Sequence, residues 1–433
     1  MLPWNNTSAA ANRQPSSVPK KRKKKRKLKL RNVRKEVWFA LAGVLAIIAV
    51  ILIPRMIQTS KLKKLGYDKE AIAAIREKKL AKTLIDNQWF SPYLSSCLKS
   101  GTVNTDYLEL YTVIEGEKYL DNTDFLMVCR LRDMGYEQDQ ILNLYRNLRF
   151  VELTPVLTYD YMLIEQNYID DCLDHPENSR DSFILHQTYR KPYEYTYPAD
   201  SSRVDMLVNK TYYLDSNFVP NDLTPLSVHS GASGTQLSKE AADAMEEWAS
   251  AGKEMGVAFY ATSSYRSYES QKNLYDVYVT QHGQQQADRE SARPGFSEHQ
   301  TGLTVDVAAT GEEDKEFGDT TAFMWAGSNC ADYGWILRYP ENKEDITGYE
   351  YESWHFRYLG KELAKAVTKT GMTYDEFWCL YLKPWNDEAN KPSQDILDST
   401  DWHNLLIEPA EEESAEPDPN ASPSAETTEQ KTE

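Results

Sequence analysis

Residues 37–53 (VWFALAGVLAIIAVILI) form an uncharged apolar run of seventeen residues. This length is at the short limit for a helix that spans a membrane. The run has no polar face, which disfavours the alternative of a buried core helix. It is also too long and too far from the N-terminus for a simple signal peptide, and no clear cleavage site follows it. We therefore predict one transmembrane helix over residues 37–54.

The charge of the chain is divided sharply on the two sides of this run. Residues 1–36 carry thirteen Lys and Arg against the single acid Glu36, a local charge of +12, so the remainder carries −29 of the total of −17. The positive-inside rule places the basic tail in the cytoplasm and everything after about residue 55 outside the cell. The basic block also fits a nucleic-acid-binding arm, but its position before the apolar run and the acidity of the rest argue against nucleic acid as a partner.

Three further regions follow the predicted membrane helix. Residues 55–182 are expected to be helical, because apolar residues recur there every three or four positions. Within them, residues 65–78 resemble residues 134–148, which fits two degenerate repeats and equally fits two unrelated helical hairpins that share a turn. Residues 183–385 have a mixed α and β pattern, and the acidic residues 386–433 form a tail too polar to fold. The five cysteines show no metal-site or disulfide-scaffold spacing, and most of them are interpreted as buried apolar residues.

Residues 183–385 contain both helix and strand signals. The clearest helix begins at a potential cap, Ser238, and ends at Gly256. Arg338 and Arg357 are compatible with surface charges. The expected helices cover residues 237–256, 267–282, 320–333, 361–370 and 374–382, and the expected strands cover residues 257–265, 303–308 and 335–339.

The candidate chemistry begins with His299 and Asp306, which are seven positions apart. An extended chain would separate them by roughly 23 Å, so they can share a ligand only if the chain folds back. Gly302 lies between them and can adopt the backbone conformation for such a turn. Asp306 then falls in a short apolar strand, where a buried carboxylate needs a partner such as a metal ion.

A second polar cluster contains Glu352 and His355. These two residues can face one site if the backbone turns locally between them. His299, Asp306 and His355 together give an N, O, N ligand set that leaves a fourth position for water, as in catalytic zinc sites. Glu352 is then the candidate general base, and Arg266 is the candidate group for the developing oxyanion. Each motif alone is weak evidence, and the prediction depends on the whole ordered set.

The ordered set resembles the VanY-type D-alanyl-D-alanine carboxypeptidases, zinc peptidases of the M15 family. The resemblance extends over about residues 200–382. It implies that His299, Asp306 and His355 bind Zn²⁺, that Glu352 is the base and that Arg266 holds the scissile carbonyl. It further implies substrate contacts by Ser297 and Gln271. The resembling segments are residues 207–223, 265–271, 291–307, 333–340 and 351–360.

The resemblance also implies the fold and the activity. The expected fold is α+β, a small antiparallel sheet flanked by helices of the kind found in the Hedgehog signalling domain. Ser264, Thr304 and Ser353 depart from the family pattern, where Gly, Ala and Pro are usual. The expected protein is a membrane-anchored, extracytoplasmic zinc carboxypeptidase that removes the terminal D-alanine from peptidoglycan stem peptides. The alternatives are an L,D-carboxypeptidase acting on tetrapeptide stems and a non-catalytic cell-wall-binding protein.

Overall fold

A computed structural model describes residues 35–112, 122–159, 162–174, 191–194, 196–312 and 315–383. The predicted basic tail lies outside these residues except for Lys35 and Glu36, and the predicted acidic tail lies wholly outside them. The described residues fall into two compact units that divide between Gln88 and Trp89.

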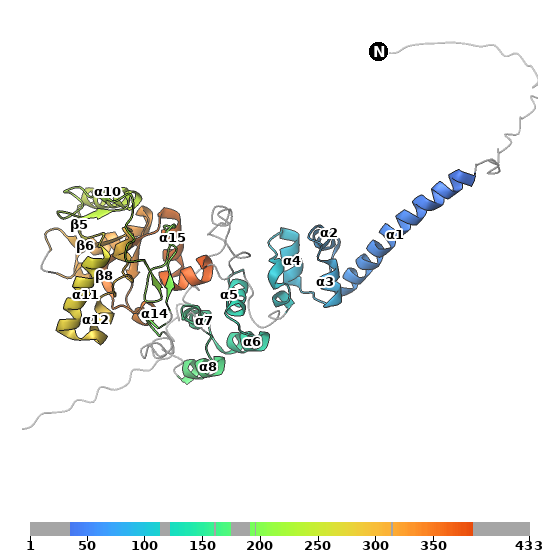
Figure 1. Ribbon diagram of the computed structural model, residues 1–433, viewed down its shortest axis with the longest axis horizontal. Coiled ribbons are helices and arrows are strands. Elements are labelled where there is room, and N and C mark those ends of the chain that lie inside the picture. The colour runs from blue at the N-terminus through green and yellow to red at the C-terminus, as the bar shows by residue number, and fades with distance from the viewer. Residues whose placement is uncertain are drawn as a thin grey trace, which may run out of the picture. The chain divides into compact units, whose positions relative to one another are not determined.

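The first unit begins with the long apolar helix α1 (Lys35–Leu65) (Figure 1). Large apolar side chains such as Phe39 and Val50 are exposed along it. It is long and apolar enough to cross a membrane, and a signal sequence would meet the same criteria. The helix does not end where the apolar run ends. It continues through Pro54 to Leu65.

Two turns in the helical region have the same local structure. Gly66 and Gly135 both have positive φ, at 119° and 104°. The amide after each glycine donates to a carbonyl five residues earlier: Tyr67 N to Leu62 O and Tyr136 N to Leu131 O, at 3.1 and 3.2 Å. Both tyrosines are buried. These matches agree with the repeat hypothesis, which stays a prediction.

Helices joined by turns and short loops make up most of the described residues of the predicted helical region. Its shorter helices are amphipathic, with apolar residues buried at three- and four-residue intervals, as in Ile72 and Ile75 of one helix and Ile141 and Leu144 of another. The helices are α2 (Lys69–Glu77), α3 (Ala81–Asp86), α4 (Pro92–Ser100), α5 (Asn122–Asp133), α6 (Gln138–Asn147), α7 (Phe150–Leu157) and α8 (Glu165–Asp174). Two short 3₁₀ turns, Thr105–Tyr107 and Leu110–Thr112, lie between α4 and α5.

A four-stranded antiparallel sheet organises the rest of the second unit, as the predicted α+β fold requires. Its strand order is β5-β6-β8-β7. Three strands match the predicted ones, and β8 was not predicted. The strands are β5 (Phe259–Ser263), β6 (Thr304–Ala309), β7 (Trp335–Tyr339) and β8 (Glu352–Tyr358). Two small sheets precede it: β1 (Tyr197–Pro198) pairs in parallel with β2 (Tyr212–Tyr213), and β3 (Thr224–Pro225) pairs antiparallel with β4 (Gln236–Leu237).

Five of the helices around the sheet lie close to their predicted positions, and two short helices, Gln284–Glu290 and Glu344–Thr347, were not predicted. One detail of the prediction is wrong: Ser238 occupies the N-cap position of α10, but its side chain makes no capping hydrogen bond. The neighbouring Lys239 amide instead donates to Asp222 at 3.0 Å. The helices are α10 (Lys239–Glu254), α11 (Tyr268–His282), α12 (Gln284–Glu290), α13 (Thr321–Asn329), α14 (Glu344–Thr347), α15 (Lys361–Thr370) and α16 (Tyr374–Phe377), and α16 continues into a π-helical turn, Trp378–Leu382.

The hydrophobic core packs against one face of the sheet only. Trp248 of α10 packs edge-on against Phe259 and Phe356, with ring centroids 4.7 and 4.9 Å apart. Because side chains alternate along a strand, Phe356 on the core face places His355 on the opposite face. The same alternation places Asp306 away from its buried neighbours Val305 and Val307. The polar residues of interest therefore lie on the sheet face that does not pack against α10.

The cysteines agree with the sequence interpretation. All five are buried free thiols in the structure: Cys97, Cys129, Cys172, Cys330 and Cys379.

Candidate metal centre

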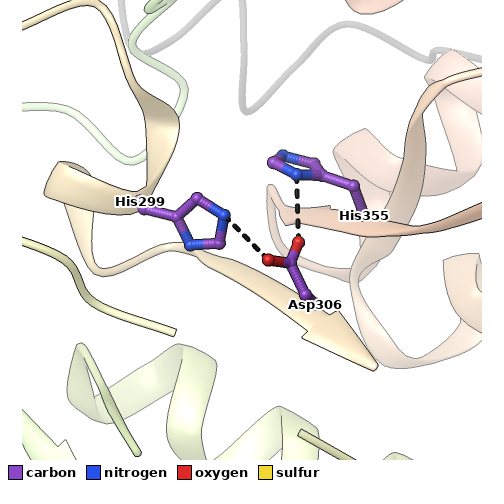
Figure 2. A group of neighbouring side chains, drawn as sticks. All are labelled: His299, Asp306 and His355. Carbon is purple, nitrogen blue, oxygen red and sulfur yellow. Dashed lines mark ion pairs between the residues drawn. The ribbon is translucent and has the colours of Figure 1, made fainter. Parts of the chain in front are cut away.

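Three predicted ligands converge on the open face of the sheet (Figure 2). Potential ligand atoms of His299, Asp306 and His355 all lie within 4.8 Å of one another. His299 Nε2 is 3.2 Å from Asp306 Oδ2, and His355 Nδ1 is 3.1 Å from Asp306 Oδ1. The structure therefore brings together residues that the sequence places far apart.

Local backbone structure explains how the first two ligands meet. His299 lies in a 3₁₀ turn, Glu298–Thr301, that ends at Gly302 with a φ of 69°. A left-handed residue reverses the chain here and lets β6 begin at Thr304. Asp306 then sits opposite His355, its direct antiparallel partner on β8. The predicted fold-back at Gly302 is confirmed.

Glu352 reaches the same point because β8 is irregular. Residues three apart on a regular strand face opposite sides of the sheet. The pairing of β8 with β7 shifts, however, between Leu337 paired with Phe356 and Tyr339 paired with Glu352. This bulge turns Glu352 to the side of His355, and Glu352 Oε2 lies 3.2 Å from His355 Nδ1.

The imidazole nitrogens of His299 and His355 that point away from Asp306 face oxygen atoms of the protein. His299 Nδ1 lies 2.7 Å from the carbonyl oxygen of Ser264 and is placed to donate to it. This hydrogen bond leaves Nε2 without a proton and directed at Asp306. His355 Nε2 faces Glu298 Oε2 at 3.7 Å. Each imidazole thus presents one nitrogen to the shared point and the other to an acceptor.

The electrostatics of the cluster favour a cation at the shared point. Burial lowers the pKa of His299, and Asp306 offsets this only in part. Burial also disfavours ionisation of Asp306, but the two histidines outweigh it and its pKa falls well below the ordinary value. Burial acts against a charged His355 too, but the carboxylates of Asp306, Glu298 and Glu352 outweigh it and raise its pKa. A positive charge between His355 and Asp306 is therefore stabilised.

The residues present fit a divalent metal ion. Asp306 Oδ1 is buried and makes no hydrogen bond, although His355 Nδ1 is close. A buried carboxylate oxygen in this state calls for another positive partner. Two imidazole nitrogens and one carboxylate oxygen are the donors of open, three-residue zinc sites. His299, Asp306 and His355 could therefore hold a catalytic metal.

A pocket of about 130 Å³ opens over the three candidate ligands. Arg266, Gln271, Ser297 and Glu352 line it, as do aromatic residues including Trp354. Arg266 donates to Gln271 Oε1 and Ser263 Oγ, both at 2.8 Å, and its Nη2 lies 3.9 Å from Asp306 Oδ2.

Gln271 and Ser297 are the two predicted substrate contacts in this pocket. The Gln271 amide nitrogen donates to Ala292 O at 2.8 Å, so both ends of this side chain have protein partners. Ser297 is buried at the pocket wall. All seven predicted site residues therefore line one pocket, and their roles remain proposals.

Sequence reasoning missed an ionic cluster behind the site. Arg338 and Arg357 are not surface charges, because both side chains are completely buried. Each donates to Glu298 Oε1, at 2.8 and 2.9 Å. For Arg338 the available signal was its position in the predicted apolar strand 335–339, where a charge must find a partner.

The antiparallel sheet and the converging His299, Asp306 and His355 are compatible with a metal-dependent enzyme. Residues 234–361 match the family model VanY: D-alanyl-D-alanine carboxypeptidase. A bifunctional D-Ala-D-Ala dipeptidase and D-Ala-D-Ala carboxypeptidase, VanXYC of Enterococcus gallinarum, is 34% identical over 179 residues, which are 40% of this chain and 91% of the relative. The chain therefore belongs to the VanY family, a family of zinc metallopeptidases.

Other similar proteins match a comparable share of the chain. The putative carboxypeptidase YodJ of Bacillus subtilis is 42% identical over 179 residues, which span 40% of this chain and 66% of that protein. The chain thus spans slightly less than two thirds of this relative. The solved structure of the LdcB LD-carboxypeptidase is 41% identical, with a TM-score of 0.38 over 40% of this chain and 84% of that chain.

Proposed function

We propose that this chain is a zinc carboxypeptidase that removes the C-terminal D-alanine from peptidoglycan stem peptides outside the cell membrane. The observation that carries the proposal is the convergence of His299, Asp306 and His355 beside Glu352. These residues line a pocket within the region that matches the VanY family.

The proposed chemistry is hydrolysis by an activated water. His299, Asp306 and His355 would hold zinc, which when bound would supply a water of lowered pKa and polarise the substrate carbonyl. Glu352 takes the proton released by this water and later returns it to the leaving amine. Its side chain is only 14% exposed but borders the open pocket, so it is accessible to substrate while held in place.

Arg266 is proposed to stabilise the oxygen of the scissile carbonyl. Burial lowers its pKa, and Asp306 counteracts this by favouring the charged form. Gln271 and Ser263 hold the guanidinium at two points, so the positive charge is fixed before substrate arrives. Gln271 would then contribute by accepting a hydrogen bond from Arg266 and so positioning its guanidinium. Ser297 would contact the terminal residue of the substrate.

The substrate class rests on relatedness. The family model and the VanXYC relative are both described by D-Ala-D-Ala carboxypeptidase activity, whereas LdcB is described as an LD-carboxypeptidase, and we propose D,D cleavage as the first activity to test. An L,D-carboxypeptidase would use the same machinery on a tetrapeptide stem. The two activities differ in the residue before the cleaved bond, so a direct comparison of stems separates them.

The proposed location rests on α1 and the charges before it. The exposed apolar helix α1 would anchor the chain in the cell membrane. The thirteen Lys and Arg before residue 37 would hold the N-terminus in the cytoplasm, leaving the pocket on the side where peptidoglycan lies. Protease treatment of intact protoplasts would then degrade the peptidase region, and protection of that region would refute this orientation.

The activity is tested with the full-length protein in detergent micelles, loaded with zinc. Synthetic pentapeptide and tetrapeptide stems are incubated with it, and the products are followed by mass spectrometry. Chelator-sensitive release of one D-alanine from the pentapeptide, and not from the Glu352→Gln variant, is expected. Cleavage of the tetrapeptide alone would assign L,D specificity. Intact stems in the presence of folded, zinc-loaded protein would reject the enzyme assignment and favour a wall-binding protein.

A further inference from the structure

The ring nitrogen of His355 that points away from the shared metal position faces a carboxylate at more than hydrogen-bond distance. His355 Nε2 and Glu298 Oε2 are both buried and both lack a hydrogen-bond partner, yet they face each other at 3.7 Å. Glu298 is completely buried. A carboxylate behind a metal-bound imidazole fixes the ring and raises its basicity as a ligand. These two atoms have the chemistry of such a contact.

The other oxygen of Glu298 explains why this carboxylate stays charged in the interior. Its Oε1 accepts from Arg338 Nε at 2.8 Å and from Arg357 Nη1 at 2.9 Å. Two guanidinium groups bound to one oxygen offset the cost of burying this carboxylate. Because Oε1 takes both arginines, Oε2 is directed at His355.

Each arginine is fixed in turn by other groups. Arg338 Nη1 donates to Asp375 Oδ2 at 2.6 Å, and Asn209 donates to Asp375 Oδ1 at 2.7 Å. Arg357 Nη2 donates to the carbonyls of Val204 and Met206, at 2.8 and 2.9 Å. The two acids and the two arginines thus balance in charge. Displacing any one of them would leave a buried charge without its partner.

We propose that Glu298 is a positioning residue for His355 and that this buried network, extended by α16 to helix α7, holds it in place. The inference rests on the proposed function, because it concerns the zinc site. It gives part of the helical region a defined role.

The link to the helical region runs through α16, which lies beyond the part of the chain that matches the family model. Asp375 and Glu376 are neighbours on this short helix and bind different partners. Asp375 binds Arg338, whereas Glu376 Oε1 accepts from Thr154 Oγ1 of α7 at 2.8 Å. Nearby, Arg130 of α5 donates to Leu380 O at 3.0 Å. Helices α5 and α7 therefore hold the segment that carries Asp375.

The test measures zinc affinity of the full-length protein in detergent by competition with a chromophoric chelator. Glu298→Gln is expected to weaken zinc binding by about 10- to 100-fold, the range for groups behind a metal ligand. Asp375→Asn is expected to weaken it less. The double variant should fall short of the product of the two single effects, because both act on His355 through one path.

A second variant covers the case in which Glu298→Gln does not fold. Glu298→Asp keeps the negative charge for the arginines but shortens the side chain, so it cannot reach them and His355 together. It is expected to fold and to bind zinc more weakly. Zinc affinity within twofold of wild type in a folded Glu298 variant would overturn the positioning role.

The helical contribution is tested with a matched pair on α7. Thr154→Val removes the bond to Glu376 and is expected to weaken zinc binding several-fold. Thr158→Val removes a hydroxyl that bonds only Pro155 O of the same helix at 2.8 Å among its described contacts, and should leave affinity unchanged. Equal effects of the two variants would overturn the link through α16. Failure of the wild type to bind zinc would instead reject the proposed function itself.

Discussion

Asp306 and His355 are direct partners across strands β6 and β8, and the Asp306 carboxylate lies between the two imidazoles of the site. Pairing on the sheet fixes the backbone positions of these two residues, and the turn at Gly302 brings in His299 as the third group. Two of the three candidate ligands are therefore placed by strand register, which is more rigid than placement by loops.

Glu352→Gln is expected to keep zinc and lose turnover. The amide cannot take a proton, so kcat should fall by roughly 10²- to 10⁴-fold, the range typical of a general base. The zinc content should stay near one per chain because the ligand set is intact. Metal analysis and stem-peptide kinetics on the same preparation measure both quantities. Near-normal turnover would remove Glu352 from the mechanism.

His299→Ala is expected to lower zinc occupancy and activity together. The change removes one of three donors from the buried set and leaves Asp306 facing a cavity. Metal content after dialysis against a weak chelator, measured beside kcat, is the relevant readout. His282→Ala is the control, because that half-exposed histidine pairs with Glu290 on the surface. Full zinc content in the His299 variant would show that the ligand set is wrong.

Much of the sheet and the site could be predicted because the signals are local. Short apolar runs indicate β5, β6 and β7, and the spacing of His299, Gly302 and Asp306 indicates a turn between two ligands. Strand β8 (ESWHFRY) was missed because polar and charged residues alternate in it with aromatic ones. These polar residues are tolerated in the interior only through partners elsewhere in the chain.

The buried charged side chains behind the site could not be predicted either, because their partners are also distant in sequence. Arg338 is buried because Glu298 and Asp375 lie beside it, and both are distant in sequence. No local pattern encodes such a pairing, since it exists only after the sheet and α16 have come together. The bulge that turns Glu352 toward His355 is likewise a property of the pairing between β7 and β8.

Gly302→Ala is expected to destabilise the fold by more than backbone strain alone. A left-handed φ costs a residue with a Cβ about 1–2 kcal/mol. A Cβ at Gly302 would also lie 3.0 Å from Ser238 Oγ and 3.1 Å from Pro220 Cγ. Gly256→Ala is the matched control, because it has a similar φ of 81° and open space around it. Chemical denaturation should show the larger loss for Gly302→Ala, and equal losses would mean that the contacts yield freely.

Thr304→Val is expected to stabilise the protein, by about 1 kcal/mol, because a buried hydroxyl without a partner is replaced by a methyl group of the same shape. Thr304 is fully buried in β6, and its Oγ1 makes no hydrogen bond. Thr320 is the matched control: it is equally buried, but its hydroxyl donates to Phe317 O at 2.6 Å and accepts from Phe323 N at 3.1 Å. Thr320→Val should therefore lower the free energy of unfolding. Denaturant titrations of both metal-free variants measure the difference, and a loss of stability in Thr304→Val would show that its hydroxyl finds a partner in solution.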